Sequence, residues 1–260
     1  AYSLGLEETV LLKAKTFAGL GMAVAFGAID FMDDYISILK KRNLGLTERQ
    51  KLVLQFAVVA AYLASVAFAG GATHTTIPFV GQVDLGWLYY PLAAVVIVGV
   101  VNAVNFTDGI DGLNTTVSFF AFLSLALCAG LLSMTGLSAM GLASAAACIG
   151  FLIWNWHPAK VFMGDTGSLF MGGMVCALAF GMDLPLLLLP VGFVYLCEIL
   201  SVVLQVTYFK ATHGKRLFKM SPIHHHFEMC GWSEVKICAV FGFVALLGGA
   251  VALLCVAFGV

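Results

Sequence analysis

Charged residues are scarce in this sequence. Only 10% of its 260 residues are Asp, Glu, Lys or Arg, and the formal net charge is −1. Such a balance offers no basic surface for nucleic acid, and we expect no nucleic-acid partner. The seven cysteines form neither a CxxC pair nor a Cys/His spacing typical of zinc, which predicts reduced thiols in the core. A glycine-rich dinucleotide fingerprint and internal repeats are also missing.

Apolar residues dominate instead. They make up 61% of the chain, and the mean hydropathy is +1.01, which is more apolar surface than one soluble core of this size would need to bury. The composition predicts an all-α polytopic membrane protein, with runs of roughly the 17 to 25 residues that cross a bilayer as a helix. Eight spans are predicted, at 16–33, 51–70, 88–104, 114–133, 137–154, 167–182, 184–206 and 236–258.

The positions of the basic residues predict the topology. If the spans alternate, nearly all of these residues fall on one side, which the positive-inside rule identifies as the cytoplasm. They are Lys40, Lys41, Arg42, Arg49, Lys51, Lys160, Lys210, Lys215, Arg216, Lys219 and Lys236. Lys13 and Lys15 are the exceptions. The opposite side carries the segment 71–87, whose alternating pattern and turn residues predict a short extracytoplasmic β-hairpin. The shortest span, 167–182, contains a Gly172-Gly173 pair that indicates either close helix packing or a kink.

Three carboxylates occur together at the predicted cytoplasmic end of the first span. Asp30, Asp33 and Asp34 have the i, i+3 and i+4 spacing that places them on one helical face. A helix C-terminus disfavours carboxylates, and they repel one another, so a cation or a basic partner would relieve both costs. The alternative is an ordinary solvated helix end neutralised by Lys40, Lys41 and Arg42.

Two further connections contain aspartates. Asp108-Gly109 and Asp111-Gly112 indicate a tight loop just before a helix near Asn114, in which Asp111 or Asn114 either caps that helix or takes part in ligand binding. The loop lacks the closing Glu of an EF-hand. Asp165 either caps the following helix or completes an oxygen-rich Mg²⁺ site, and Phe162 is placed to stack on a base.

Histidines 224 to 226 stand in a row in the fourth polar connection. Consecutive residues point in different directions on a helix or strand, so the three rings cannot converge on one ion. The run is internal and is flanked by Pro222 and Phe227, unlike a purification tag. With Lys215 and Arg216 shortly before it, the segment is suited to phosphate recognition.

Four motifs together resemble the bacterial phospho-N-acetylmuramoyl-pentapeptide transferases, a branch of the polyprenyl-phosphate N-acetylhexosamine-1-phosphate transferases. They are Asp33-Asp34-Tyr35, Asn-Phe-Thr-Asp-Gly-Ile-Asp-Gly-Leu at 105–113, Phe-Met-Gly-Asp-Thr-Gly-Ser at 162–168 and Ser-Pro-Ile-His-His-His-Phe-Glu at 221–228. The resemblance runs from about residue 16 to the C-terminus. It implies transfer of phospho-MurNAc-pentapeptide from its UDP carrier to undecaprenyl phosphate in the bacterial cytoplasmic membrane, forming lipid I and UMP with Mg²⁺. It also implies a homodimer.

The resemblance assigns a role to each candidate site residue. Asp33, Asp34, Asp165 and His224 are expected to be catalytic, with Asp165 as the Mg²⁺ ligand and Asp33 or Asp34 as base or, less favoured, nucleophile. The expected substrate-binding residues are Lys51, Asn102, Asn105, Asp108, Gly109, Asp111, Asn155, Phe162, His225 and His226. The family has ten transmembrane helices. We therefore expect residues 1–260 to be one integral-membrane catalytic domain without most of the first two helices, with residues 1–12 as a remnant of an earlier helix.

Two other functions fit some of these features. The UDP-GlcNAc branch of the same superfamily shares the acidic motifs and differs in the donor that it accepts. A transporter would also carry carboxylates and glycine-broken helices in the membrane. Against a transporter, the polar motifs cluster at one face, and Glu198 is the one ionisable residue predicted to lie deep in a span.

Overall fold

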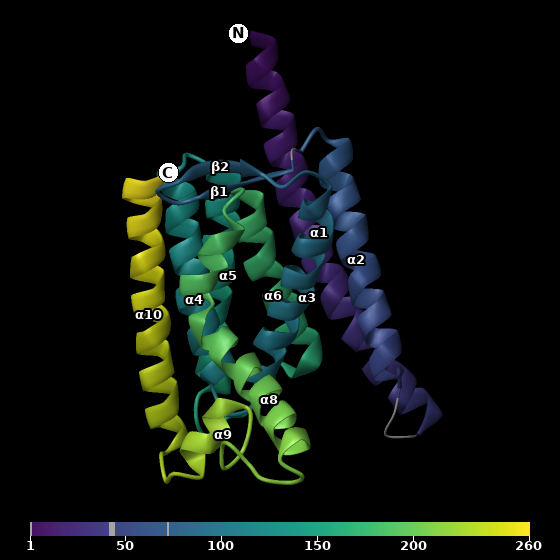
Figure 1. Ribbon diagram of the computed structural model, residues 1–260, viewed down its shortest axis with the longest axis vertical. Helices are drawn as coiled ribbons and strands as arrows, with labels where there is room; N and C mark the ends of the chain where they lie inside the picture. The colour runs from purple at the N-terminus through teal and green to yellow at the C-terminus, as the bar shows by residue number, and fades with distance from the viewer. Residues whose placement is uncertain (1, 42–44, 72) are drawn as a thin grey trace.

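A computed structural model describes residues 2–41, 45–71 and 73–260 of the chain. These residues are almost entirely helical, with one small two-stranded sheet (Figure 1). In chain order, with η for short 3-10 helices, the elements are α1 (Tyr2–Lys40), α2 (Glu48–Phe68), β1 (His74–Ile77), β2 (Gly81–Asp84), η1 (Gly86–Leu88), α3 (Tyr89–Thr107), α4 (Leu113–Leu131), α5 (Thr135–Asn155), α6 (Gly164–Gly181), η2 (Pro185–Leu187), α7 (Leu188–Val191), α8 (Phe193–Ala211), α9 (Ile223–Glu228) and α10 (Glu234–Gly259).

Within the described residues, seven helical segments are long and apolar enough to cross a membrane. They are α1 from Val10 onward, α2, η1 with α3, α4, α5, α8 and α10. This confirms the predicted polytopic all-α membrane protein. The predicted span 167–182 corresponds to α6, an 18-residue helix that is mostly buried in the protein. The predicted span 184–206 is divided, because η2 and α7 end at a break at Gly192 before α8 begins.

Helix α6 lies at the centre of the bundle, in contact with α1, α3, α4 and α5. Its paired glycines allow close approach on two sides. A Cβ added to Gly172 would lie 2.7 Å from the Cα of Val101 in α3, and one added to Gly173 would lie 2.7 Å from the Cα of Ala23 in α1. The helix runs unbroken through both residues. The pair therefore serves close packing rather than a kink, and it holds the middle of α6 against α1 and α3.

The predicted hairpin is also confirmed. β1 and β2 pair antiparallel, with His74 opposite Asp84. The N–H of Thr76 donates to the carbonyl oxygen of Asp183 at 2.9 Å, which attaches the sheet to the loop after α6. The side chain of Asp183 in turn pairs with Lys15, whose Nζ lies 2.6 Å away. Lys15, one of the two exceptions to the charge asymmetry, is therefore buried in an ion pair at the hairpin end.

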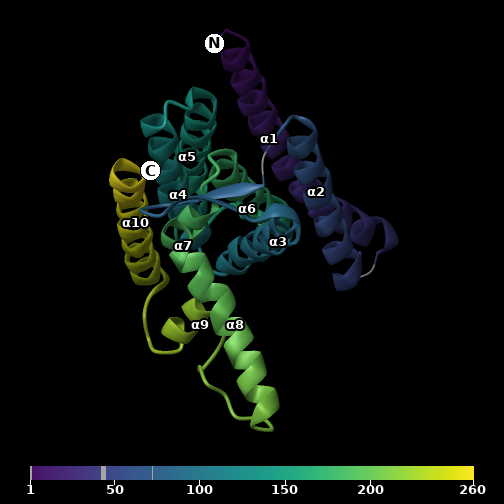
Figure 2. The ribbon, with the colours of Figure 1, turned by 45° about the horizontal axis from the view of Figure 1, so that its top comes forward.

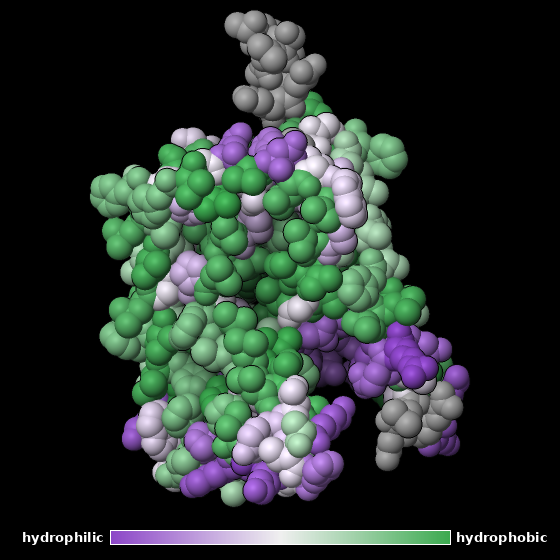
Figure 3. Space-filling view, viewed as in Figure 1, coloured by the Kyte–Doolittle hydropathy of each residue, from purple (hydrophilic) through white to green (hydrophobic). Residues whose placement is uncertain are grey.

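The two ends of the bundle are built from different elements. The hairpin crosses one end, and α9 with the long loops around it lies at the other (Figure 1). Figure 2 shows α8 leaning away from the bundle toward the end with the loops. In the space-filling view, apolar residues cover the middle of the visible face, and hydrophilic residues gather along its lower edge and at the lower right (Figure 3). The motif-bearing loops therefore share the end opposite the hairpin.

Candidate active site

Three carboxylates surround the ammonium group of Lys51. Its Nζ lies 2.9 Å from Asp30 Oδ1, 2.6 Å from Asp33 Oδ2 and 3.9 Å from Asp165 Oδ2. Thr47 caps the start of α2 through its side chain, which places Lys51 one turn later, facing α1. The basic partner expected for the acidic run thus comes from α2, and the cluster joins α1, α2 and α6.

The acidic run does not end its helix. No Gly or Pro interrupts the sequence from 28 to 44, and α1 continues to Lys40. The expectation of a helix C-terminus at these carboxylates is therefore wrong. Within the described residues, Asp30 and Asp33 pair with Lys51 and not with Lys40 or Lys41, and Arg42, the third expected partner, lies outside those residues. Asp33 is committed to Lys51 and also accepts the N–H of Leu46. Asp34 is exposed and makes no ion pair in the described part of the chain.

Asp165 stands in the first turn of α6, where the helix dipole favours a carboxylate. It does not cap the helix, because the N-cap residue is Met163, which makes no side-chain capping bond. Asn105, near the end of α3, donates from Nδ2 to Asp165 Oδ1 at 3.1 Å and to Ser168 Oγ at 2.8 Å. The Asp165 side chain is 59% exposed. Mg²⁺ prefers oxygen ligands and usually takes one or two carboxylates together with substrate phosphates. The carboxylate of Asp165 is accessible to solvent and lies close to other acidic side chains, so this set of oxygen donors fits Mg²⁺.

The loop after α3 packs against the histidine segment. Burial, followed by the nearby charge of Asp165, raises the pKa of the Asp108 carboxyl to about 6. The next residue, Gly109, touches the imidazole of His224. A Cβ on Gly109 would lie 2.2 Å from His224 Nε2, so only a residue without a side chain allows this contact.

His224 is fully buried, and Glu198 of α8 holds its ring. His224 Nδ1 lies 3.1 Å from Glu198 Oε2, and neither side chain is exposed. Because an ionised carboxylate can only accept hydrogen bonds, the contact with Glu198 requires the proton of the neutral imidazole to be on Nδ1. Among the described residues, His224 Nε2 has no hydrogen-bond partner, and it lies on the side of Gly109.

The other two histidines have different partners. His225 Nδ1 contacts Glu228 Oε2 within α9. His226 Nδ1 accepts the backbone N–H of Lys219 at 3.1 Å, which leaves its Nε2 as the protonated nitrogen when the ring is neutral. The three rings thus bind three separate groups, in agreement with the prediction that they cannot converge on one ion.

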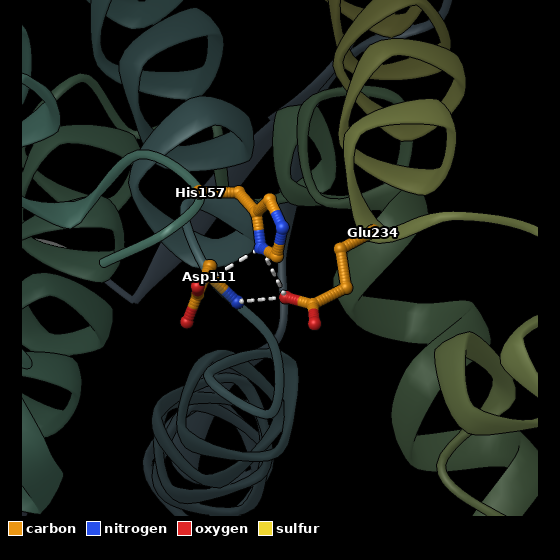
Figure 4. Close-up of side chains that lie close together, drawn as sticks. All are labelled: Asp111, His157 and Glu234. Carbon is orange, nitrogen blue, oxygen red and sulfur yellow. Dashed lines mark hydrogen bonds and ion pairs between the residues drawn. The ribbon is translucent and has the colours of Figure 1, made fainter.

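Asp111 joins three segments rather than capping a helix. Its Oδ2 accepts the N–H of Ala159 at 2.9 Å and lies 3.1 Å from His157 Nδ1, both in the loop after α5. Its own N–H donates to Glu234 Oε2, in the first turn of α10, at 3.1 Å (Figure 4). The N-cap of α4 is Gly112, without a side-chain bond, so the capping interpretation of Asp111 is wrong.

Three further candidates differ in exposure. Asn155 is buried, accepting from Thr115 Oγ1 at 2.7 Å and donating to the carbonyl oxygen of Val161 at 3.0 Å. Asn102 donates to Gln55 Oε1 at 2.8 Å, between α3 and α2. Phe162 is 71% exposed, as a ring that receives a base must be. The first two thus hold the elements around the site, and only Phe162 offers a free face.

Sequence reasoning assigned no role to several polar residues that the structure places here. Asp30 is 2% exposed and pairs with Lys51, and its i, i+3 spacing with Asp33 was the available signal. Glu198 was noticeable as the one deep ionisable residue. Ser168 lay inside the motif at 162–168 but received no role of its own, and Glu234 gave no signal, because single polar residues near helix starts are common.

The fold and this end of the bundle define a multi-pass membrane enzyme. Residues 16–183 match the family model described as glycosyl transferase family 4. Over 227 residues, the chain is 45% identical to the phospho-N-acetylmuramoyl-pentapeptide-transferase of Halalkalibacterium halodurans, covering 87% of this chain and 70% of that one. The enzymes of the same name from Bacillus mycoides and Bacillus thuringiensis are each 43% identical over 255 residues, covering 94% of this chain and 78% of theirs.

The chain is thus a membrane-embedded phosphoglycosyl transferase. More narrowly, it belongs to the phospho-N-acetylmuramoyl-pentapeptide transferases of glycosyl transferase family 4, which confirms the family indicated by the four motifs.

Proposed function

We propose that this protein transfers phospho-MurNAc-pentapeptide from UDP-MurNAc-pentapeptide to undecaprenyl phosphate, forming lipid I and UMP for peptidoglycan synthesis. The observation that carries the proposal is the cluster of Asp30, Asp33 and Asp165 around Lys51, beside the exposed carboxylate of Asp34. Two phosphate-bearing substrates repel each other. An enzyme that joins them must therefore supply cationic groups and fixed hydrogen-bond donors.

The step is a displacement at phosphorus. An oxygen of the acceptor phosphate attacks the β-phosphorus of the nucleotide, the bond to the bridging oxygen breaks, and UMP leaves with that oxygen. Asp33 is occupied by Lys51 and by Leu46, whereas Asp34 is exposed and has no ion pair among the residues that the structure describes. We therefore assign Asp34 as the group that takes a proton from the acceptor. Lys51 and Asn105 hold the carboxylates in place around the reacting phosphates.

Mg²⁺ is the proposed cofactor, with Asp165 as its protein ligand. The ion would neutralise the charge that develops on the phosphate oxygens of the donor. Asp165 suits this role because it is exposed at a helix N-terminus and is oriented by the amide of Asn105.

The nucleoside end of the donor is proposed to lie along the loops after α3 and α5. Phe162 offers an exposed ring for the uracil, and Asp108, Gly109 and Asp111 of the loop after α3 are proposed to supply polar groups to the same nucleoside. His225 and His226, on α9, are proposed to meet the sugar and phosphates. His224 is proposed to contribute to catalysis indirectly, because its buried ring, held by Glu198, packs against Gly109 and so positions the loop of Asp108 beside the donor.

An apolar cavity of about 550 Å³ supports the proposal that the acceptor is a lipid. It lies between α3 and the segment from η2 to α8, and it is lined by residues such as Leu92, Val96, Leu188, Leu196 and Ile199. A polyprenyl chain requires such a surface, and α3 also carries Asn105 at its far end. By the positive-inside rule, we place the active site on the cytoplasmic side of the bacterial inner membrane. The homodimer implied by the resemblance stays a prediction.

A turnover assay tests the proposal. Purified protein in detergent receives polyprenyl phosphate and Mg²⁺, with either UDP-MurNAc-pentapeptide or UDP-GlcNAc, and release of UMP is measured. We expect turnover with UDP-MurNAc-pentapeptide and none with UDP-GlcNAc. Asp165→Asn is expected to abolish this turnover while the protein stays folded. Turnover with UDP-GlcNAc alone would place the protein in the other branch. Solute uptake by proteoliposomes without turnover would instead support the transporter.

A further inference from the structure

Asp111, His157 and Glu234 bring three donor atoms together outside the carboxylate cluster of the active site. Asp111 is in the loop after α3, His157 is in the loop after α5, and Glu234 is in the first turn of α10 (Figure 4). One oxygen or nitrogen from each lies within 4.8 Å of the other two. Three segments that are distant in sequence thus meet at one point.

The distances at this point are compatible with a shared metal ion. His157 Nδ1 lies 3.1 Å from Asp111 Oδ2 and 3.5 Å from Glu234 Oε2. In a tetrahedral zinc site with bonds of about 2.0 to 2.2 Å, neighbouring ligand atoms are about 3.3 to 3.6 Å apart. The distances from the imidazole nitrogen to the two carboxylates, 3.1 and 3.5 Å, thus lie near this range, and the two carboxylates are within 4.8 Å of each other.

The charge of the cluster also favours a cation. Within the described residues, the ion pairs of Asp111 and Glu234 are both with His157. The lysine nearest in sequence, Lys236, lies over the ring of Trp232 instead. Two carboxylates that share one imidazole leave a net negative charge that a bound cation would offset.

The ligands are oriented by neighbouring groups, as in known metal centres. Ala159 N–H holds Asp111 Oδ2, and Asp111 N–H holds Glu234 Oε2. The side chains are 18%, 45% and 30% exposed for Asp111, His157 and Glu234, so the ligands are partly shielded while solvent can supply a fourth ligand.

We propose that Asp111, His157 and Glu234 bind a divalent transition metal of the zinc class. The imidazole makes this donor set a poor match for Mg²⁺, which takes oxygen ligands, and a good match for Zn²⁺. The ion would tie the loops after α3 and α5 to the start of α10, beside the proposed donor site, and it is separate from the Mg²⁺ proposed at Asp165.

Calorimetric titration of metal-free protein with Zn²⁺ alone, without substrates, tests the site. We expect one bound ion, with affinity reduced by at least about tenfold in His157→Ala and in Glu234→Gln. His213→Ala is the matched control, since this exposed histidine contacts no carboxylate in the described residues, and it should bind as tightly as the wild type. Equal affinity in His157→Ala, or no binding by the wild type, would overturn the proposal.

Two further measurements cover competing explanations. Cys230 Sγ lies 3.8 Å from His226 Nε2, so a thiol site could also take Zn²⁺. If the titration signal disappears in Cys230→Ser and persists in His157→Ala, the assignment is wrong. X-ray absorption of the Zn²⁺-loaded wild type should show nitrogen and oxygen neighbours, and a sulfur neighbour would overturn the site even if a variant failed to fold. None of these readouts depends on turnover, so a failed transferase assay would leave the result unaffected.

Discussion

The imidazole of His224 and the carboxylate of Glu198 form a fully buried pair, with Nδ1 3.1 Å from Oε2. The same oxygen also lies 3.5 Å from the backbone nitrogen of His224. Glu198 sits on α8 and His224 on α9, so the pair links a membrane helix to the histidine segment. It also leaves Nε2 of His224 directed at the loop that contains Gly109.

Glu198→Leu is expected to destabilise the protein and to abolish turnover. The substitution leaves a buried N–H without an acceptor, which costs about 1 to 3 kcal/mol for a neutral group. Glu198→Gln keeps an acceptor oxygen and should recover much of the thermal stability and part of the turnover. Thermal unfolding in detergent and UMP release measure the two effects. If the Leu variant equals the wild type in both, the pair has no positioning role.

Gly109→Ala is expected to impair turnover through His224. The new Cβ would lie 2.2 Å from Nε2, so either the ring or the loop must move. The matched control is Gly150→Ala in α5, where an added Cβ meets nothing within 4 Å. The control should keep full activity, and its helix should be as stable as in the wild type or more so. Equal activity of both variants would show that the contact between loop and ring is unimportant.

Lys51→Met is expected to lower thermal stability strongly. Lys51 is the cation for Asp30, whose side chain is 3% exposed, and removing one partner of a buried ion pair costs about 3 to 5 kcal/mol. The double variant Lys51→Met/Asp30→Asn removes both charges of that pair and should be more stable than Lys51→Met alone. Thermal unfolding of the wild type, the single variant and the double variant measures these differences. A double variant no more stable than the single would contradict the pairing.

The sequence was sufficient for the membrane class, the hairpin and most helices, because long apolar runs and turn residues act locally. It was not sufficient for the end of α1. The charges of Asp30, Asp33 and Asp34 suggested a helix terminus, whereas Lys51, distant in sequence, pairs with Asp30 and Asp33 inside the helix. Tertiary pairing of this kind cannot be read from local spacing.

The candidate site shows the same division. Aspartates beside glycines marked the loops, but not what each carboxylate contacts. Asp111 satisfies the sequence pattern of a helix cap and instead binds Ala159 and His157, because the loop after α5 folds onto it. Likewise Glu198 could be noticed as a buried charge, but its partner required the placement of α9 against α8.

The neighbours Asp33 and Asp34 should respond differently to removal of charge. Asp33→Asn weakens a pair with Lys51 and is expected to reduce thermal stability as well as the rate. Asp34→Asn removes an exposed carboxylate and is expected to lower kcat with little change in melting temperature or in donor affinity. Kinetics together with calorimetry of donor binding would separate the two. Loss of donor affinity at an unchanged rate in Asp34→Asn would move this residue from the proton-transfer step to the binding site.

The raised pKa of Asp108 predicts a dependence of stability on pH. Burial, helped by the charge of Asp165, raises this pKa to about 6 from an ordinary value of 3.8. The folded protein therefore binds the proton more tightly than the unfolded chain. The stability that Asp108 contributes is present at low pH and is lost as the pH rises through about 6. Asp108→Asn removes the titration, so it should raise the melting temperature at pH 7.5 and have a smaller effect at pH 5.

Melting curves are to be recorded with a chelator, because a bound cation near Asp165 would offset the repulsion. Asp84→Asn, at an exposed carboxylate in the hairpin whose pKa is lowered by its bond from Thr73, is the control and should not raise the melting temperature at pH 7.5. If Asp108→Asn changes the melting temperature equally at both pH values, the carboxyl of Asp108 does not titrate in this range.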